Sequence, residues 1–499
     1  MKAYYETYRY TDEIRRLKAQ SIVECRLSGS EINAVLAVQA KVTPTECGVT
    51  DGEVRYGGRL TLGIVYEDAD KNICRAERGA DFFHKAADPV LSPSCSARAI
   101  LEAENISIRR EGTGLYVSVI VGATLPVYGS AKIDYVSGGE DLISRKTGLT
   151  VWGLETAAAE TEIEDEFDAD YVGDILLHAE NVLVTGAVAD GGQVDLDGEM
   201  AVNICALKSD GGLCAYEKLI PFHIQIPCEA AFGNCPIAAR VTVKSARVSA
   251  GTDEEKGRSK MALSALLSAE CVLYKKDEIL IVEDAYCTGQ EITLKKQNAT
   301  GRYLTNVTKH VERVSGSAAI DGEIDDTCIL QAAVLPRAEL VCKKNEQGEA
   351  YAEGVVQADV LYVCDGSHKK VTLSLPVEFP LRGEWKEQTT CEALAYGLNV
   401  KRRKNGEIEV EGTLKAVTSV YEKCGGEYIS EIIEGEPFEE EGYGISVFLP
   451  REGEELWQVA KRLRCKPEDL QKSNPTLTFP VKKGERIVVC RGFGENLEK

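Results

Sequence analysis

One short pattern occurs three times in this sequence, and it constrains the fold more than any other feature. The segment DGEVRYGGRLTLGIVYED at 51–68 is matched 140 positions later by GGQVDLDGEMAVNICALK at 191–208 and 296 positions later by QGEAYAEGVVQADVLYVC at 347–364. Each copy has two glycines six positions apart, followed by an apolar residue at every second position. Alternation with period two is typical of a strand with one buried face, so each copy predicts a glycine turn followed by a β-hairpin.

The glycines of the three copies align in two sets. The first set lies at the expected turn and the second lies inside the expected strand: Gly52, Gly192 and Gly348, then Gly58, Gly198 and Gly354. We interpret all six as structural, because glycine permits a positive φ or a close approach of two backbones. The sequence lacks both the P-loop motif and a strand-linked G-x-G-x-x-G, so we do not expect a phosphate-binding loop.

The long spacing between copies indicates whole domains rather than the short units of a solenoid. A chain of 499 residues exceeds one ordinary core. We therefore expect a mainly β protein with three tandem β-sandwich or barrel-like domains and a small βααβ domain after them. The expected bounds are 1–155, which includes an N-terminal extension, 156–315 and 316–430, then an acidic linker at 431–444 and the small domain at 445–491.

Charge and composition exclude several classes of partner. The net charge of −22 repels phosphate backbones, so nucleic acid is not expected as a ligand. No run reaches the roughly 18 apolar residues of a membrane helix, and the first residues do not resemble a signal peptide. We therefore expect no transmembrane segment and a cytoplasmic address. The 17 cysteines include no C-x-x-C pair, and we expect most of them to be reduced and buried.

The sequence offers no recognisable catalytic or metal site. The five histidines are scattered singly, without H-E-x-x-H and without cysteines at zinc-ligand spacing. No pair of carboxylates stands in a context that marks it as an acid and a base. We expect no catalytic residues, no metal and no cofactor, although an active site assembled from several domains remains open at this point.

The C-terminal segment has a different character. From 445 to 499 there are eleven Lys and Arg against eight Asp and Glu, so this tail carries +3 while the rest carries −25. A strand at 445–449 leads to a turn at Gly453 and to a helix with apolar residues at i, i+3, i+4 and i+7, namely Leu456, Val459, Ala460 and Leu463. Pro467 begins a second short helix, which ends before Asn474-Pro475, and a strand follows at 487–489.

This segment resembles the LysM domain. The family pattern of strand, glycine, polar pair, Leu-Trp and a second helix that ends at Asn is matched here, and it implies a shallow groove that binds N-acetylglucosamine polymers such as peptidoglycan. The residues that the resemblance places at the groove are Gly453, Glu454, Glu455, Leu456, Trp457, Asn474 and Pro475. LysM domains usually carry Asp-Thr where Glu454-Glu455 stand, so we expect a bulkier, doubly anionic rim and contact with protein more than with sugar. For Trp457 we favour half-buried packing over stacking on a sugar.

Repeated β domains followed by LysM resemble the SPOCS-domain spore coat morphogenetic proteins of endospore-forming bacteria. The resemblance is carried by Gly52, Val54, Gly58, Leu60, Ile64 and Tyr66, with Ala206 replacing the tyrosine in the middle copy. It implies a non-catalytic scaffold in the mother-cell cytoplasm at the forespore surface. Its partners would be a coat basement-layer protein and other coat proteins. Two alternatives stay open, a cell-wall protein that binds peptidoglycan and an enzyme of unknown class.

Overall fold

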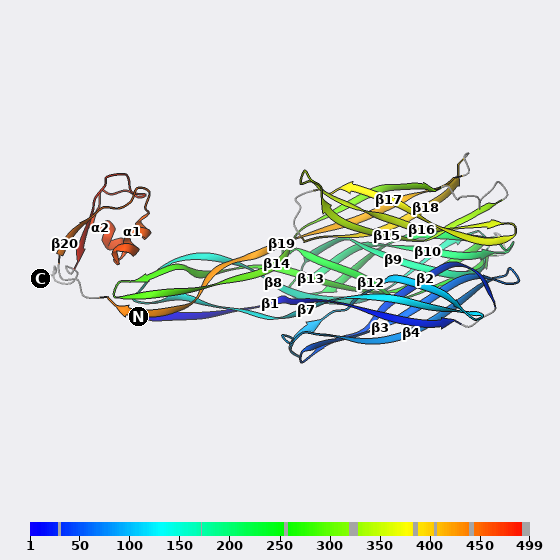
Figure 1. Ribbon diagram of the computed structural model, residues 1–499, viewed down its shortest axis with the longest axis horizontal. Helices are drawn as coiled ribbons and strands as arrows, with labels where there is room; N and C mark the ends of the chain where they lie inside the picture. Colours follow the sequence, from blue (N-terminus) through cyan, green and yellow to red (C-terminus); the bar gives the residue numbers. More distant parts are fainter. Residues whose placement is uncertain are drawn as a thin grey trace.

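A computed structural model describes residues 1–27, 31–170, 172–253, 258–318, 328–382, 388–403, 407–438 and 444–491. Most of these residues lie in antiparallel strands, and the helices within these ranges are α1 (Leu456–Leu463) and α2 (Pro467–Ser473). The molecule is elongated, with a wide body at one end, a narrow stalk of long strands, and a small module beside the end of the stalk (Figure 1). The prediction of a mainly β chain is confirmed.

The first repeat contains two sheets. The hairpin sheet has the order β2 (Ile32–Thr50), β3 (Glu53–Asp68), β4 (Ile73–Ala87). The second sheet contains two long strands, β1 (Lys2–Leu27) and β7 (Gly114–Glu140), together with β5 (Ser96–Ala97) and β6 (Ile100–Glu111). Because the same stretch of β7 pairs with β1 and with β6, β7 is the central strand.

The second and third repeats have the same plan. Their hairpin sheets are β9 (Val172–Asp190), β10 (Gln193–Lys208) and β11 (Leu213–Pro227), then β15 (Ile329–Lys344), β16 (Ala350–Cys364) and β17 (Ser367–Pro380). Their long-strand sheets are β8 (Leu142–Ala169), β13 (Arg258–Cys287) and β12 (Ile237–Asp253), then β14 (Gln290–Ala318), β19 (Ile408–Pro437) and β18 (Gln388–Arg402). In all three repeats the middle strand of the hairpin sheet carries the glycine pattern.

The first two repeats agree down to single hydrogen bonds. The Gly52 N–H donates to the Leu91 carbonyl at 3.1 Å, and the Gly192 N–H donates to the Ala231 carbonyl at the same distance. The return bonds also match, since the N–H groups of Asp88 and Cys228 donate to the carbonyls of Gly52 and Gly192 at 2.9 Å. Each matched pair is separated by the same 140 positions that relate the two sequence copies.

The repeat glycines fall into two geometric classes. The turn glycines Gly52, Gly192 and Gly348 have φ of 75°, 87° and 85°, a region that residues with a Cβ rarely adopt. The strand glycines lie where a Cβ would collide with a neighbour: at Gly58 it would be 2.7 Å from Cζ of Phe82, and at Gly198 it would be 2.7 Å from the Leu183 carbonyl oxygen. At Gly354 it would overlap the carbonyl oxygen of Glu339, which is backbone and cannot rotate away.

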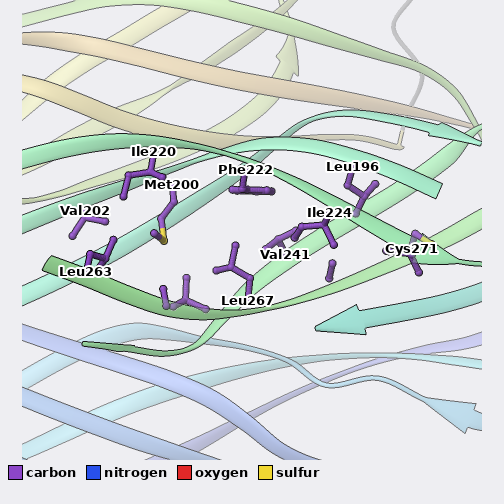
Figure 2. Packing of buried hydrophobic residues seen from close by; sticks show 14 of the residues in the cluster. Leu196, Met200, Val202, Ile220, Phe222, Ile224, Val241, Leu263, Leu267 and Cys271 are labelled. Atoms are coloured by element: carbon purple, nitrogen blue, oxygen red, sulfur yellow. The ribbon is translucent and has the colours of Figure 1, made fainter. Parts of the chain in front are cut away.

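Each repeat buries an apolar core between its two sheets. In the second repeat Met200 from β10, Phe222 from β11, Val241 from β12 and Leu267 from β13 point into one interior (Figure 2). The alternation in the sequence produces this arrangement, because successive side chains of a strand point to opposite faces. Leu60, Leu62 and Ile64 occupy the matching core of the first repeat.

The stalk is formed by unusually long strands that leave the body together, namely β1, β7, β8, β13, β14 and β19 (Figure 1). They contain 26 to 30 residues each, far more than the ordinary length of about five or six. Residues from all three repeats share small cores along the stalk, for example Tyr135 of β7, Ile281 of β13 and Tyr428 of β19. The repeats are therefore side by side and share cores, an arrangement that tandem spacing alone does not predict.

The repeats also meet in the body. A buried apolar cluster contains residues from the first hairpin strand of each of the three repeats. Among them are Leu36 from β2, Leu177 from β9 and Val334 from β15. Ion pairs or His–carboxylate contacts connect each pair of repeats: Lys41 with Glu180 at 2.8 Å, Lys415 with Glu199 at 2.6 Å, and His368 with Glu67 at 3.1 Å. Apolar and polar contacts together hold the three repeats in one body.

The expected domain boundaries lie inside strands. The boundary at 155/156 falls in β8, and the boundary at 315/316 falls in β14. The repeats instead join at tight connections, Asp141 between β7 and β8 and residues 288–289 between β13 and β14. The physical reason is that the long strands continue from the body into the stalk, so that the chain reverses at the far end of the stalk.

The expected acidic linker at 431–444 is largely strand at its start. Residues 431–437 belong to β19 and pair with β14, with Glu431 opposite Lys295 and Glu434 opposite Ile292. These glutamates thus project from a paired strand, and residues 439–443 lie outside the described residues.

The cysteines include both disulfide-bonded residues and free thiols. Cys328 and Cys364 form a disulfide between the residue preceding β15 and the end of β16. Fourteen others in the described part of the chain are free thiols, among them the buried Cys205 and Cys271. Burial raises the pKa of both thiols, to about 12 for Cys205 and about 11 for Cys271, which keeps them protonated near neutral pH.

Candidate functional site

The terminal module, residues 444–491, is the candidate functional site. It consists of the pair β20 (Gly444–Phe448) and β21 (Ile487–Arg491) with α1 and α2 between them. Its core contains Val459, Ala460 and Leu463 of α1, Leu470 of α2 and Ile487 of β21. The apolar stripe predicted for the first helix therefore faces the interior of the module, except that Leu456 is only partly buried.

The loop before α1 is tied to the loop before β21. Gly453 has φ of 87°, and its N–H donates to the Val481 carbonyl at 2.8 Å. The Val481 N–H donates in return to the Glu454 carbonyl at 3.0 Å. These reciprocal main-chain bonds hold together the two loops, and the resemblance to LysM implies a binding groove between them.

The two glutamates at the expected rim differ from each other. Glu454 accepts from the Arg462 guanidinium at 2.5 Å and from the Arg451 N–H at 2.8 Å, so its charge is paired within the module. Glu455 is the N-cap of α1, and its N–H donates to the side-chain oxygen of Gln458 at 3.0 Å. Arg462 thus pairs with the charge of Glu454, and the Glu455 carboxylate accepts the Gln458 backbone N–H in a capping box, whereas the sequence predicted a doubly anionic rim.

Asn474 is buried and its amide is fully used inside the module. Its Nδ2 donates to the carbonyls of Leu470 at 2.9 Å and Val488 at 2.8 Å, and its Oδ1 accepts from the Val488 N–H at 2.7 Å. Asn474 therefore joins the end of α2 to β21, while its neighbour Pro475 is exposed. Of these two residues, Pro475 is the one with surface available to a ligand.

We expect Asn474→Ala to destabilise the terminal module by about 1–3 kcal/mol, because Val488 would lose both of its side-chain partners. Hydrogen exchange measured by mass spectrometry on the peptide that covers β21 should become faster. Ser473→Ala, one residue earlier and exposed, is the control. Equal exchange in the two variants would contradict the structural role of Asn474.

Trp457 contacts the stalk. Its indole Nε1–H donates to Oδ2 of Asp284 at 2.8 Å, and its ring meets the ring of Tyr286 edge to face with centroids 5.2 Å apart. Asp284 and Tyr286 belong to β13, at the end of the stalk. Nothing in the local sequence could reveal this contact, because Asp284 and Trp457 are 173 positions apart and neither lies in a shared motif.

Asp284 also forms an ion pair with a lysine of the module. Lys461 Nζ lies 2.5 Å from its Oδ1. Burial alone would favour the neutral acid, but the hydrogen bonds from Lys461 and Trp457 hold the pKa of Asp284 below its ordinary value. The carboxylate is therefore charged at neutral pH and pairs with Lys461.

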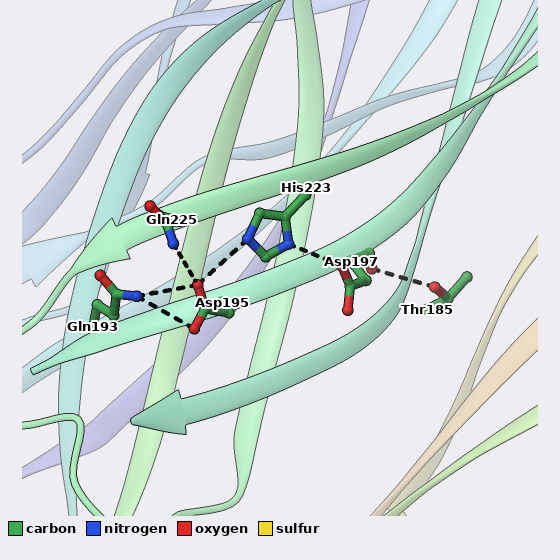
Figure 3. Close-up of polar contacts among 6 residues, drawn as sticks. All are labelled: Thr185, Gln193, Asp195, Asp197, His223 and Gln225. Carbon is green, nitrogen blue, oxygen red and sulfur yellow. Dashed lines mark hydrogen bonds and ion pairs between the residues drawn. The ribbon is translucent and has the colours of Figure 1, made fainter. Parts of the chain in front are cut away.

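An exposed histidine cluster around His223 lies in the body. His223 of β11 lies 2.9 Å from Asp197 and 3.5 Å from Asp195 of β10, as Figure 3 shows. The hydrogen bond with Asp197 raises the pKa of His223. The hydroxyl drawn in this group, on Thr185, donates to the main-chain carbonyl of Asp197. The cluster can thus hold a proton, but the six residues drawn in Figure 3, which also include Gln193 and Gln225, place no nucleophile against the imidazole.

A cleft of about 520 Å³ separates the second and third repeats. Its lining includes Val188 of β9, Ile237 of β12, Val307 of β14 and Ser419 of β19. The lining also includes the polar and charged side chains of Asn306, Lys309 and Glu392. Within the described ranges, no group of three or more His, Cys, Asp or Glu is suited to hold a metal ion.

Comparisons with known proteins gave no match to a family model, to a curated protein or to a solved structure. The described residues also contain no helix long and apolar enough to cross a membrane.

Proposed function

We propose that this chain is a non-catalytic scaffold of the bacterial spore coat. It would act in the mother-cell cytoplasm at the forespore surface and connect a coat basement-layer protein to other coat proteins. In this proposal the three repeats are tandem SPOCS-like domains and the terminal module is a LysM domain. The support is the sequence resemblance together with the order of the parts: three copies of one glycine-hairpin unit, then one βααβ module.

The observation that carries this proposal is the agreement of the first two repeats in both sequence and hydrogen bonding. Gly52 and Gly192 occupy the same turn, with the same partners at the same offsets. Repeated use of one unit is typical of proteins that present several similar surfaces. A scaffold needs such surfaces, whereas a single-site enzyme does not need three copies of one unit.

The shape of the molecule also suits a scaffold. Strands of 26 to 30 residues at about 3.3 Å per residue span roughly 85–100 Å. The stalk thus separates the terminal module from most of the body (Figure 1). The two ends can then contact different layers of an assembly at the same time.

A fluorescent fusion in a sporulating host tests the location, and we expect a ring around the forespore. A pull-down from sporulating cells with the full chain, compared with a chain that ends at Gly444, tests the role of the module. Loss of a coat protein from the shorter bait is the expected result. Signal in the wall of growing cells, or calorimetric binding of chitin or peptidoglycan oligomers by the full chain, would instead favour the alternative of a cell-wall protein.

A further inference from the structure

Helix α1 has two distinct faces. One face carries Val459, Ala460 and Leu463, which pack into the core of the terminal module. The second face carries Trp457, Lys461 and Arg464, at i, i+4 and i+7, with Arg464 as the C-cap residue. Residues at this spacing lie in one row along a helix, so these three side chains can meet one surface together.

The end of the stalk meets this second face with complementary chemistry. The Asp284 carboxylate lies between the Trp457 indole N–H and the Lys461 ammonium, at 2.8 and 2.5 Å. The Tyr286 hydroxyl donates to the carbonyl of Cys465, just after the helix, at 2.7 Å. These contacts engage an aromatic ring, a charge and a main-chain carbonyl at once.

Two further side chains complete the contact. Arg145 of β8 lies over the Trp457 ring, 5.7 Å from its centroid. The Arg464 guanidinium lies over the ring of Phe438, which directly follows β19, at 3.4 Å from the ring centroid. Cations over aromatic faces contribute about 0.5–2 kcal/mol each, depending on exposure. The stalk surface is thus formed by three strands or their continuations: β8, β13 and β19.

We propose that the end of the stalk is an intramolecular dock for the terminal module, held by Asp284, and that docking closes the Trp457 face of α1. Only five residues, 439–443, separate the last described residue of the stalk from the module. A short connection gives the module an effective concentration in the millimolar range at the dock. Even a contact that is weak between separate molecules is then populated, and it can still open.

The dock has a consequence for recognition. While the module is docked, the Trp457 indole N–H and the Lys461 ammonium are bonded to Asp284, so a partner meets them only in competition with the stalk. A protein that uses the Trp457 face has to displace Asp284 and Tyr286, so the chemistry it must offer is a carboxylate beside an aromatic ring. This inference concerns contacts within the chain, so it does not depend on the proposed function.

Selective ¹⁵N labelling of tryptophan in the full chain tests the dock. The chain has three tryptophans, so the indole resonances of Trp457 and Trp152 are assigned by Trp457→Phe and Trp152→Phe. Trp152, which stacks on Tyr303 in the main part of the molecule, is the internal reference. In the unmodified chain we expect the indoles of Trp457 and Trp152 to relax with the slow tumbling of the whole molecule. In Asp284→Ala we expect the Trp457 resonance to shift and to relax several-fold more slowly in its transverse component, while Trp152 stays unchanged.

Lys461→Ala removes the same ion pair from the module side and should give the same result, which separates undocking from local damage to the stalk. Glu434→Gln is the matched control, because Glu434 lies on β19 near the end of the stalk and bonds to Gln290 rather than to the module. The dock is contradicted if Trp457 already relaxes like a small independent module in the unmodified chain. It is equally contradicted if Asp284→Ala and Lys461→Ala leave the Trp457 resonance unchanged.

Discussion

Gly354→Ala is expected to destabilise the third repeat by about 3 kcal/mol or more, close to the upper end of overpacking effects. The added Cβ would overlap the Glu339 carbonyl oxygen and would lie 3.0 Å from the Leu340 Cα. Both atoms belong to the backbone of β15, the strand that pairs with β16 at this point. Relief would therefore require the two strands to separate, which breaks ladder hydrogen bonds.

Two other glycines provide the comparison. Gly348→Ala, at the turn of the same hairpin, meets no atom within 4 Å but has φ of 85°, so it should cost about 1–2 kcal/mol through backbone strain. Gly48→Ala, in open space and without a positive φ, should be nearly neutral. Urea unfolding followed by circular dichroism measures all three, and hydrogen exchange locates the loss in β15 and β16. An effect of Gly354→Ala as small as that of Gly48→Ala would show that the strands are not this close.

The period-two patterns allowed much of the fold to be predicted from the sequence. The alternation of Leu60, Leu62 and Ile64 places these side chains in one core because the side-chain period of a strand is fixed by its geometry. The short helices could also be predicted, since the spacing of i, i+3, i+4 and i+7 indicates α1 and Pro467 and Asn474-Pro475 mark the start and the end of α2. Local signals were therefore sufficient for the element types.

The stalk could not be predicted in the same way. Strands such as β8 alternate clearly, with Ile163 and Phe167 packed against the core of the second repeat and the exposed Glu164 and Glu166 between them. The sequence boundary was nevertheless drawn at 155/156, inside this strand. Periodicity states which face of a strand is buried, but it does not state whether one strand serves the body and the stalk at once.

The candidate site shows the same limit more sharply. The resemblance places both Trp457 and Asn474 at the groove, and for Trp457 the sequence favours half-buried packing. In the structure Trp457 bonds to Asp284, whereas the amide of Asn474 bonds within the module. A side chain with one polar group and a broad ring is compatible with either role. Which role Trp457 takes depends on Asp284 of β13, and a single sequence does not show that these two residues are in contact.

Glu67 presents a buried charge at the junction of the first and third repeats. Its side chain is fully buried on β3 and accepts from the Asn33 amide at 2.8 Å and from His368 of β17, through the main-chain N–H at 2.5 Å and the ring Nδ1 at 3.1 Å. Burial alone would raise the pKa of Glu67, but these donors lower it below its ordinary value of 4.5. The charged form is thus the one that the fold stabilises.

We expect Glu67→Gln to destabilise the body by about 2–3 kcal/mol at neutral pH, since hydrogen bonds to a charged acceptor contribute about 1.5–3 kcal/mol and an amide cannot accept from three donors as well. The sign of the pH dependence follows from the lowered pKa. A carboxyl whose folded pKa lies below its unfolded value stabilises the fold above pH 4.5 and loses this contribution as pH falls through the folded pKa. The difference between the unmodified chain and Glu67→Gln should therefore be largest at neutral pH and shrink in acid.

Urea unfolding at about pH 7 and about pH 3.5, on either side of the isoelectric point near 4.9, measures this difference. Glu77→Gln is the matched control, because Glu77 lies on β4 of the same sheet and is exposed. Its effect should be small at both pH values. A penalty for Glu67→Gln that stays constant between the two pH values would mean that Glu67 contributes through shape rather than charge. In that case the contact with His368 would not be the electrostatic connection between the first and third repeats that the geometry indicates.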